Sequence, residues 1–253
     1  MGKVYLVGAG PGDPELLSLK AYRLIKEADV ILIDNLVLGV KELIPEGKEV
    51  IDTGKNAKKH KYTQDAINAL LVDLSEKYDK VVRLKGGDPY IFGRGGEEAA
   101  VLKASGVDFE VVPGITSAVA VPASFSIPLT FRGISSSVTI ITGHEMDEKE
   151  DSINWEAIAN LKGTLVILMG VGNLVTNVDA LLEHGMHAET PVAMIENGFT
   201  ADARLIIGTL GTIVAVAAKE KVNPPAVIVI GDVVNVREKL TQENKLLTQI
   251  NAD

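Results

Sequence analysis

The stretch KVYLVGAGPGDPELLSLKAYRLIKEADVILID, residues 3–34, decides the fold. It opens with an apolar, β-branched run that predicts a strand over Lys3–Gly8, followed by a glycine- and proline-rich turn. Leu16, Leu17, Leu24 and Ile25 then fall on one face of a predicted helix over Glu15–Ala28, and a second strand is expected over Val30–Asp34. A strand, a helix and a second strand in this order are typical of a parallel sheet with crossover helices.

The same alternation continues along the chain. In the first half the sequence predicts a helix over Asp65–Lys77, capped by Thr63, with Ala66, Leu70 and Leu74 facing inward, and strands over Glu49–Asp52, Lys80–Leu84 and Phe109–Val112. In the second half it predicts helices over Asn173–His184 and Thr209–Glu220, and strands over Val138–Thr142, Thr164–Met169, Pro191–Glu196, Arg204–Ile207 and Ala226–Gly231.

The alternation stops in the Pro- and Ser-rich segment 126–137 and then restarts. We therefore expect an α/β fold of two α/β domains. The first covers residues 1–126 and carries the Gly-rich loops, the second covers 127–240, and a polar tail follows over 241–253.

Composition excludes several classes of protein. Among 253 residues there is no cysteine, which excludes disulfides, thiolate zinc sites, iron–sulfur clusters and a cysteine nucleophile. A formal charge of −9 argues against a nucleic-acid partner. Pro or Gly interrupts the longest apolar tracts, 118–131 and 205–218, so we expect no membrane span and a cytoplasmic protein.

Glycine-rich turns follow three of the predicted strands, at the edge where open α/β sheets bind ligands. The first, Gly8–Pro14, permits a dinucleotide site with Asp34 on the ribose, but Asp13 and Pro11 are unfavourable for pyrophosphate. In the second, Arg83–Glu98, glycines allow close approach of a ligand, and Asp88 could accept hydrogen bonds from an ammonium or hydroxyl group. The third, Val112–Ala118, suits either a ligand or a simple helix cap.

Four motifs together resemble the tetrapyrrole methylases. They are GAGPGDP at 8–14, RLKGGDPYIFGRGGEE at 83–98, VPGITSA at 112–118 and PLTFRG at 128–133, and the resemblance extends from residue 3 to about residue 238. The second motif is similar to that of members that methylate uroporphyrinogen III. Phe131, where family members commonly have His, and Ala201–Ala203, in place of a Gln-rich stretch, depart from the family pattern.

The resemblance implies two α/β domains with S-adenosylmethionine in the trough between them, in a homodimer that needs no metal. By position, the implied cofactor-binding residues are Pro11, Gly86, Gly87, Asp88, Ile91, Thr116, Ser117, Met169, Gly198 and Ala226. Backbone donors, one carboxylate and apolar walls suit this cofactor better than a phosphate cradle would.

The implied reaction is a pair of methyl transfers to ring carbons of uroporphyrinogen III, through precorrin-1 to precorrin-2, with S-adenosylhomocysteine as the second product. The implied catalytic residues are Asp34, Lys55, Arg83 and Met169. Asp34 is the candidate for receiving the pyrrole proton or for binding pyrrole N–H groups, although a strand-end cap is its alternative reading. Met169 is either a pocket residue or core filler.

A polycarboxylate substrate requires cations. Candidates are Lys55, Lys58, Lys59, His60 and Lys61 in one loop, and Arg83, Lys85, Arg94 and Arg132 in the motifs. His184 and His187 are expected to be exposed and structural, because Gly185 between them ends the helix. His144 follows a strand in a family motif, and its role is left open.

Three alternatives stay open at this stage. One is a methylase of the same fold that acts on a later corrinoid precursor or on the modified histidine of diphthamide. The second is an NAD-dependent oxidoreductase that uses Gly8–Gly12 and Asp34. The third is a ligand-binding protein without catalysis. The sequence leaves open whether the product feeds sirohaem, cobalamin or another branch of porphyrin biosynthesis.

Overall fold

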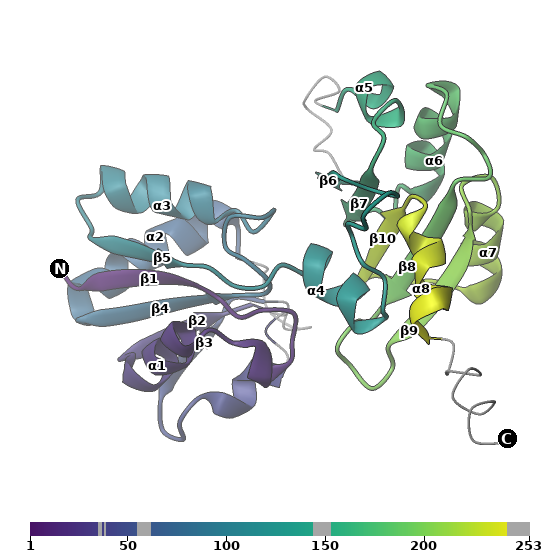
Figure 1. The fold of residues 1–253 in the computed structure, drawn as a ribbon. Helices are drawn as coiled ribbons and strands as arrows, with labels where there is room; N and C mark the ends of the chain where they lie inside the picture. The colour runs from purple at the N-terminus through teal and green to yellow at the C-terminus, as the bar shows by residue number, and fades with distance from the viewer. Residues whose placement is uncertain (35–36, 38, 55–61, 144–152, 242–253) are drawn as a thin grey trace, which may run out of the picture. The chain divides into compact units, whose positions relative to one another are not determined.

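The computed structural model describes residues 1–34, 37, 39–54, 62–143 and 153–241, and the chain divides into two compact units, Met1–Ser117 and Ala118–Asp253 (Figure 1). The division falls before the predicted boundary at residue 126. Helix α4, Ser117–Ser124, accounts for the difference, because its Ala118 and Val121 are buried in a core of the second unit. The α/β class predicted from the sequence is confirmed in both units.

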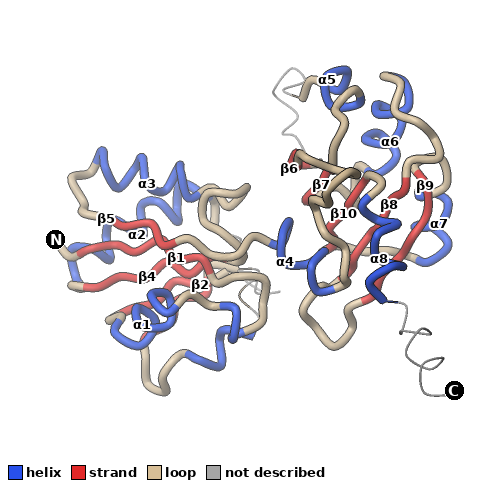
Figure 2. The backbone as a smooth tube through the Cα atoms, viewed as in Figure 1, coloured by secondary structure: helices blue, strands red, loops and turns tan. Residues whose placement is uncertain are grey.

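The first unit contains a five-stranded parallel sheet (Figure 2). Its strand order is β3-β2-β4-β1-β5, with β1 at Lys3–Gly8, β2 at Val30–Ile33, β3 at Glu49–Asp52, β4 at Lys80–Lys85 and β5 at Phe109–Val112. Because all pairs are parallel, the carboxyl ends of the strands share one edge. The loops after the strands therefore gather at that edge.

Helices cover both faces of this sheet (Figure 1). Helix α1, Leu19–Glu27, packs on one face against Val7, Ile31 and Val82. Helices α2, Gln64–Lys77, and α3, Gly95–Ala104, pack on the other face against Leu6 and Leu32. Successive strand residues point to opposite faces, so each central strand contributes to both cores.

Two helix predictions in this unit need correction. The single helix expected over Glu15–Ala28 is a 3-10 helix, Pro14–Leu16, followed by α1, because the Ser18 side chain accepts a hydrogen bond from Ala21 N and caps a new helix. In α2 the Thr63 cap is confirmed. Of the three residues predicted to face inward, Leu74 is buried, whereas Ala66 and Leu70 are not, and Ile67 and Leu71 are buried in their place.

The second unit contains a mixed sheet of order β6-β7-β10-β8-β9. Its strands are β6 at Val138–Thr142, β7 at Thr164–Leu168, β8 at Pro191–Glu196, β9 at Arg204–Thr209 and β10 at Ala226–Ile230. Strands β6 and β7 pair in parallel, whereas β10 runs antiparallel to both β7 and β8, and β8 pairs antiparallel with β9. The second sheet is therefore mixed, although both halves of the sequence show the same alternation of strands and helices.

Helices also cover both faces of the second sheet. Helices α5, Trp155–Ala159, α6, Leu174–Glu183, and α7, Ile213–Glu220, pack on one core, and α4 and α8, Val233–Thr241, pack on the other. None of the helices in the described parts of the chain has the length and apolar character needed to cross a membrane. Residues 242–253 of the predicted polar tail lie outside the described residues.

Candidate functional site at the strand ends

The three glycine-rich turns predicted as ligand loops meet at the carboxyl edge of the first sheet. Gly10 and Gly87 exchange two backbone hydrogen bonds, Gly10 N to Gly87 O at 3.1 Å and Gly87 N to Gly10 O at 2.7 Å. The Gly114 N–H donates to Asp88 Oδ2 at 3.1 Å. These contacts join the turns after β1, β4 and β5 into one cradle.

Glycine is required where these turns touch. A Cβ on Gly114 would lie 2.2 Å from Gly87 O, and a Cβ on Gly8 would lie 2.5 Å from Gly114 N. Gly87 differs, because its φ is +66° and a Cβ there would meet only ordinary contacts of 3.7 Å with Thr116 and Ser117. The open side of Gly87 therefore leaves room for a ligand.

The remaining candidates in this unit lie around the cradle. Pro11 lies between Gly10 and Gly12, both with positive φ. The Ile91 side chain is exposed, whereas Asp88 accepts hydrogen bonds from Tyr90 N and Gly114 N through its two oxygens. Its carboxylate thus holds two turns together while retaining further acceptor capacity.

Asp13 closes the helix terminus that a dinucleotide would need. Its Oδ1 accepts a hydrogen bond from Glu15 N at 2.9 Å, and Pro14 occupies the first turn of the 3-10 helix. A pyrophosphate site uses free N–H groups at the start of an α-helix directly after the turn. Here a carboxylate occupies that position and α1 begins only at Leu19, which disfavours the oxidoreductase alternative.

Three further candidates lie at one edge of the second sheet. The register pairs Leu168 with Val227 and Glu196 with Ala226, so the ends of β7 and β8 meet the start of β10. Met169 follows β7, Gly198 follows β8 and Ala226 begins β10, so the three residues lie at neighbouring strand ends. Met169 has φ +56° and its side chain is exposed, so it is not core filler. Non-glycine residues with such backbone angles concentrate at functional sites.

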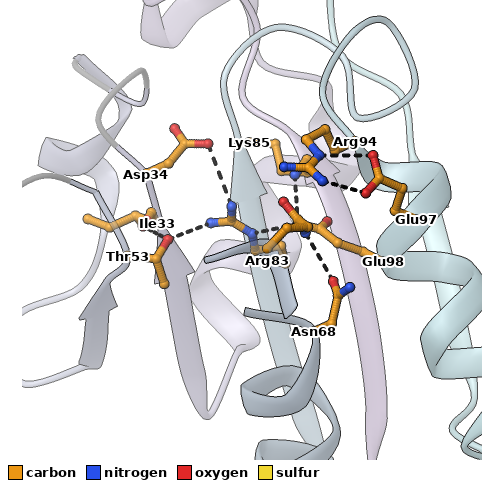
Figure 3. Close-up of polar contacts among 10 residues, drawn as sticks. Ile33, Asp34, Thr53, Asn68, Arg83, Lys85, Arg94, Glu97 and Glu98 are labelled. Atoms are coloured by element: carbon orange, nitrogen blue, oxygen red, sulfur yellow. Dashed lines mark hydrogen bonds and ion pairs between the residues drawn. The ribbon is translucent and has the colours of Figure 1, made fainter. Parts of the chain in front are cut away.

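A polar cluster adjoins the cradle at the ends of β2 and β4 (Figure 3). The Arg83 guanidinium donates through Nη1 to Thr53 Oγ1 at 3.2 Å and through Nε to Glu98 Oε1 at 3.3 Å, and its Nη2 lies 3.8 Å from Asp34 Oδ2. The Arg83 side chain is only 4% exposed, whereas that of Asp34 is 29% exposed. Asp34 is therefore the member of this pair that faces solvent.

Lys85 completes the buried part of the cluster. Its Nζ donates to Glu98 Oε1 at 2.9 Å, and Gln64 Nε2 donates to the same oxygen at 3.3 Å. Burial lowers the pKa of the Lys85 ammonium below its usual 10.5, and the nearby Arg83 charge lowers it further, while Glu98 opposes both effects. The interior at this position is thus costly for a second positive charge.

Arg94 and Glu97 form an exposed ion pair at the start of α3. Arg94 has φ +59° and donates through Nε and Nη2 to the two carboxylate oxygens of Glu97, at 2.9 and 2.6 Å. The hydrogen bond raises the pKa of Arg94 and lowers that of Glu97. Glu97 and Glu98 are adjacent in sequence but lie in opposite environments, one in solvent and one in the core.

Some predicted residues are not part of these groups. Lys55, Lys58–Lys61 and His144 lie outside the described residues. Arg132 is exposed on the turn after α4. His184 and His187 are exposed, and α6 ends at Glu183 before Gly185, as predicted. In the described ranges no group of three or more His, Asp or Glu side chains could hold a metal ion.

Sequence reasoning missed Glu98 and Thr53. A signal for Glu98 exists, because Gly95, Glu98, Ala99 and Leu102 follow the i, i+3, i+4, i+7 spacing of a buried helix face. A glutamate on that stripe requires a buried cation as partner. Thr53 lies one residue beyond β3, and no pattern in the sequence distinguishes it.

These features define an α/β protein with a candidate small-molecule site at the strand ends, in which Asp13 occupies the helix terminus after the first glycine-rich turn. The family described as Tetrapyrrole (Corrin/Porphyrin) Methylases matches residues 3–214. The S-adenosyl-L-methionine-dependent uroporphyrinogen III methyltransferase of Methanosarcina barkeri is 53% identical over 96% of this chain and 96% of its own length. The uroporphyrinogen-III C-methyltransferase of Methanocaldococcus jannaschii is 50% identical over 93% of this chain and 98% of its own.

A solved structure is also similar to this chain in sequence and in fold. The uroporphyrin-III C-methyl transferase from Thermus thermophilus, complexed with S-adenyl homocysteine, is 42% identical, with a TM-score of 0.81. The match covers 93% of this chain and 100% of that chain. The protein described here therefore belongs to the tetrapyrrole methylase family.

Proposed function

We propose that this protein is an S-adenosylmethionine-dependent C-methyltransferase that converts uroporphyrinogen III to precorrin-2 by two successive ring-carbon methylations. The observation that carries the proposal is the cradle formed by three glycine-rich turns beside the Asp34–Arg83 pair. Relatives at 53% and 50% identity that bear the corresponding name support the same reaction.

The residues of the cradle fit S-adenosylmethionine. The amino-acid part and the adenosine of this cofactor require backbone donors, acceptors and apolar walls. Gly86, Gly87 and Asp88, with Thr116 and Ser117 beside them, offer these groups around the open side of Gly87. Pro11, Ile91, Met169, Gly198 and Ala226 complete the proposed cofactor set. When bound, the cofactor supplies a methyl group already activated by a sulfonium, so no metal is required.

The remaining task of the chain is to orient the substrate and manage a proton. Asp34 is proposed to accept the proton lost from the pyrrole system or to bind pyrrole N–H groups, since its carboxylate reaches solvent at the sheet edge. The buried Arg83 guanidinium contacts that carboxylate on the side away from solvent. Lys55 is proposed to bind substrate carboxylates, and Met169 to contact cofactor or substrate.

Three further expectations belong to this proposal. Precorrin-1 would serve as the second substrate, the active form would be a homodimer, and the enzyme would work in the cytoplasm. All three rest on the family resemblance. The product would serve porphyrin-derived pathways such as sirohaem and cobalamin biosynthesis. Sedimentation equilibrium tests the dimer directly.

Three rival functions make different predictions. A methylase of a later corrinoid precursor or of diphthamide would bind S-adenosylmethionine but would not methylate uroporphyrinogen III. An NAD-dependent oxidoreductase would bind NADH, which the position of Asp13 disfavours. A non-catalytic binding protein would show affinity for the cofactor without turnover.

One paired experiment separates these functions. Calorimetric titration with S-adenosylmethionine and with NADH, followed by transfer of labelled methyl groups to uroporphyrinogen III under anaerobic conditions, measures binding and turnover separately. We expect binding of the first ligand alone and label in the tetrapyrrole. Binding without label would contradict the proposed substrate, and NADH binding would contradict the proposed cofactor.

A further inference from the structure

Glu98 is a buried carboxylate outside the proposed catalytic set. It lies on α3 with no exposed surface, and one of its oxygens, Oε1, accepts from Arg83 Nε, Lys85 Nζ and Gln64 Nε2. The other oxygen, Oε2, is buried without a hydrogen-bond partner among the described residues. These three hydrogen bonds thus converge on a single atom.

The pleat of the sheet explains why these groups meet. Val81 faces the core under α2 and α3, and Arg83 and Lys85 follow it at intervals of two residues on the same face of β4. On the adjacent strand Leu32 faces the same core and pairs with Arg83, and Asp34 comes two residues later. Glu98 therefore reaches Arg83 from the helix, while Asp34 reaches it from the strand end (Figure 3).

We propose that Glu98 is a positioning residue for methyl transfer, which holds the Arg83 guanidinium in the orientation that fixes the Asp34 carboxylate. The proposal rests on the proposed function, in which Asp34 acts on the substrate. Glu98 itself touches neither substrate nor cofactor in this account.

The geometry of Arg83 supports positioning. Its planar group is held at three points, by Glu98 at Nε, by Thr53 at Nη1 and by Asp34 at Nη2. Thr53 is itself fixed, because its Oγ1 donates to Ile33 O at 2.8 Å. A guanidinium bound along two edges has little freedom to rotate, so the third edge presents a defined partner to Asp34.

The energetics do not favour a purely stabilising role. Burial of two cations with one carboxylate is expensive, and well-packed apolar residues of similar volume are often at least as stable as a buried ion cluster. The lowered pKa of Lys85 reflects that cost. Functional sites commonly retain such costly arrangements because orientation depends on them.

Glu98→Gln tests the proposal, because it keeps the shape and removes the charge. We expect kcat to fall about 10-fold to 100-fold, because small misplacements of reacting groups cause losses of this size. The KM for S-adenosylmethionine should stay unchanged. Glu98→Asp keeps the charge and should recover part of kcat. The matched control is Glu110→Gln, which removes partly exposed ion pairs with Lys3 and Lys20 in the same unit and should leave kcat unchanged.

A double variant separates positioning from stability. Glu98→Gln with Lys85→Met removes one charge of each sign and restores the charge balance of the core, so it should fold even where the single variant does not. The proposal predicts that kcat stays low, since Arg83 still lacks its anchor. Wild-type kcat in the double variant or in Glu98→Gln would overturn the proposal.

An NMR measurement gives a readout besides activity. In the wild-type protein the Nε–H of Arg83, identified by its loss in Arg83→Lys, should resist exchange with solvent, and in Glu98→Gln that protection should weaken, because a neutral amide oxygen is a poorer acceptor than a carboxylate. An unprotected Nε–H signal in the wild type would contradict the claim that Glu98 holds the Arg83 guanidinium. Absence of methyl transfer in the wild type, with protection intact, would instead contradict the proposed function.

Discussion

The ammonium of Lys85 lies 2.9 Å from the carboxylate of Glu98, and both side chains are almost completely buried, at 4% and 0% exposure. This pair ties β4 to α3 directly beneath the proposed site. Burial and the neighbouring Arg83 charge nevertheless lower the pKa of Lys85. The contact with Glu98 therefore offsets only part of the cost of placing Lys85 in the interior.

That lowered pKa predicts how stability depends on pH. The Lys85 pKa lies below 10.5 in the folded chain and returns to that value on unfolding. Between the two values the unfolded chain binds more protons, so the free energy of unfolding rises with pH across this window. Lys85→Met should lack this rise. Urea unfolding of both chains at a series of alkaline pH values tests it, because shifts at Lys3, Tyr78 and Lys80 are common to both chains and cancel. A constant difference would contradict the prediction.

The neighbouring glutamates of α3 should differ sharply in stability. Glu97→Ala removes an exposed ion pair and should change the free energy of unfolding by at most about 1 kcal/mol. Glu98→Ala leaves Arg83 and Lys85 buried without their shared partner and should cost about 3–5 kcal/mol. Chemical denaturation at neutral pH measures both. Equal effects would show that Glu98 is not buried as described.

Gly87→Val should abolish S-adenosylmethionine binding. The chain itself leaves ordinary contact distances of 3.7 Å for a Cβ there, so the expected loss comes from blocking the ligand. Gly106→Val is the matched control, because Gly106 also has a positive φ, +72°, but faces open space. Both variants should lose similar stability from backbone strain. Calorimetric titration should show wild-type affinity only in Gly106→Val; wild-type affinity in a folded Gly87→Val would place the cofactor elsewhere.

Asp34→Ala should lower methyl transfer while leaving cofactor affinity nearly unchanged. Loss of a positioned acid or base typically costs about 10²–10⁴ in rate. Arg83 retains Glu98 and Thr53 in this variant, so the fold should persist. Asp52→Ala, at the end of the adjacent strand β3, is the control and should have little effect on rate. An unchanged rate in Asp34→Ala would remove Asp34 from the mechanism.

Much of the first unit could be predicted from the sequence because its parallel strands are short runs that contain apolar, β-branched residues, and glycine lies at or just after the ends of β1, β4 and β5. Lys3–Gly8, Glu49–Asp52 and Phe109–Val112 are predicted with their observed bounds. The helix after the first strand was less predictable, since Leu16, Leu17, Leu24 and Ile25 share a face although Ser18 starts a new helix between them. Local capping overrides periodicity at that point.

In the second unit, the direction of a strand could not be predicted from the sequence pattern. The strand positions were predictable, but the direction of β10 between β7 and β8 depends on tertiary pairing that alternation does not encode. In the first unit, helix α3 was missed for a different reason, because its first residues, Gly95 and Gly96, are typical of a loop. Gly95 is nonetheless required, since a Cβ there would lie 2.5 Å from Pro89 O.

The candidate site was predictable in its turns and not in its polar support. Glycine motifs indicated where Gly87 and Asp88 lie, and the family resemblance supplied their proposed roles. Arg83 was expected to bind substrate carboxylates. Its burial among Glu98, Thr53 and Asp34 instead favours a role in orienting the Asp34 carboxylate. Such a contact between a strand and a helix has no signature in either segment alone.

The mass of the product formed from uroporphyrinogen III and S-adenosylmethionine under anaerobic conditions tests the central claim most directly. The account predicts a tetrapyrrole that gains two methyl groups, with S-adenosylhomocysteine formed in twofold amount. An unchanged tetrapyrrole in the presence of enzyme that binds S-adenosylmethionine would contradict it, and would assign the cradle to a methylase of another substrate.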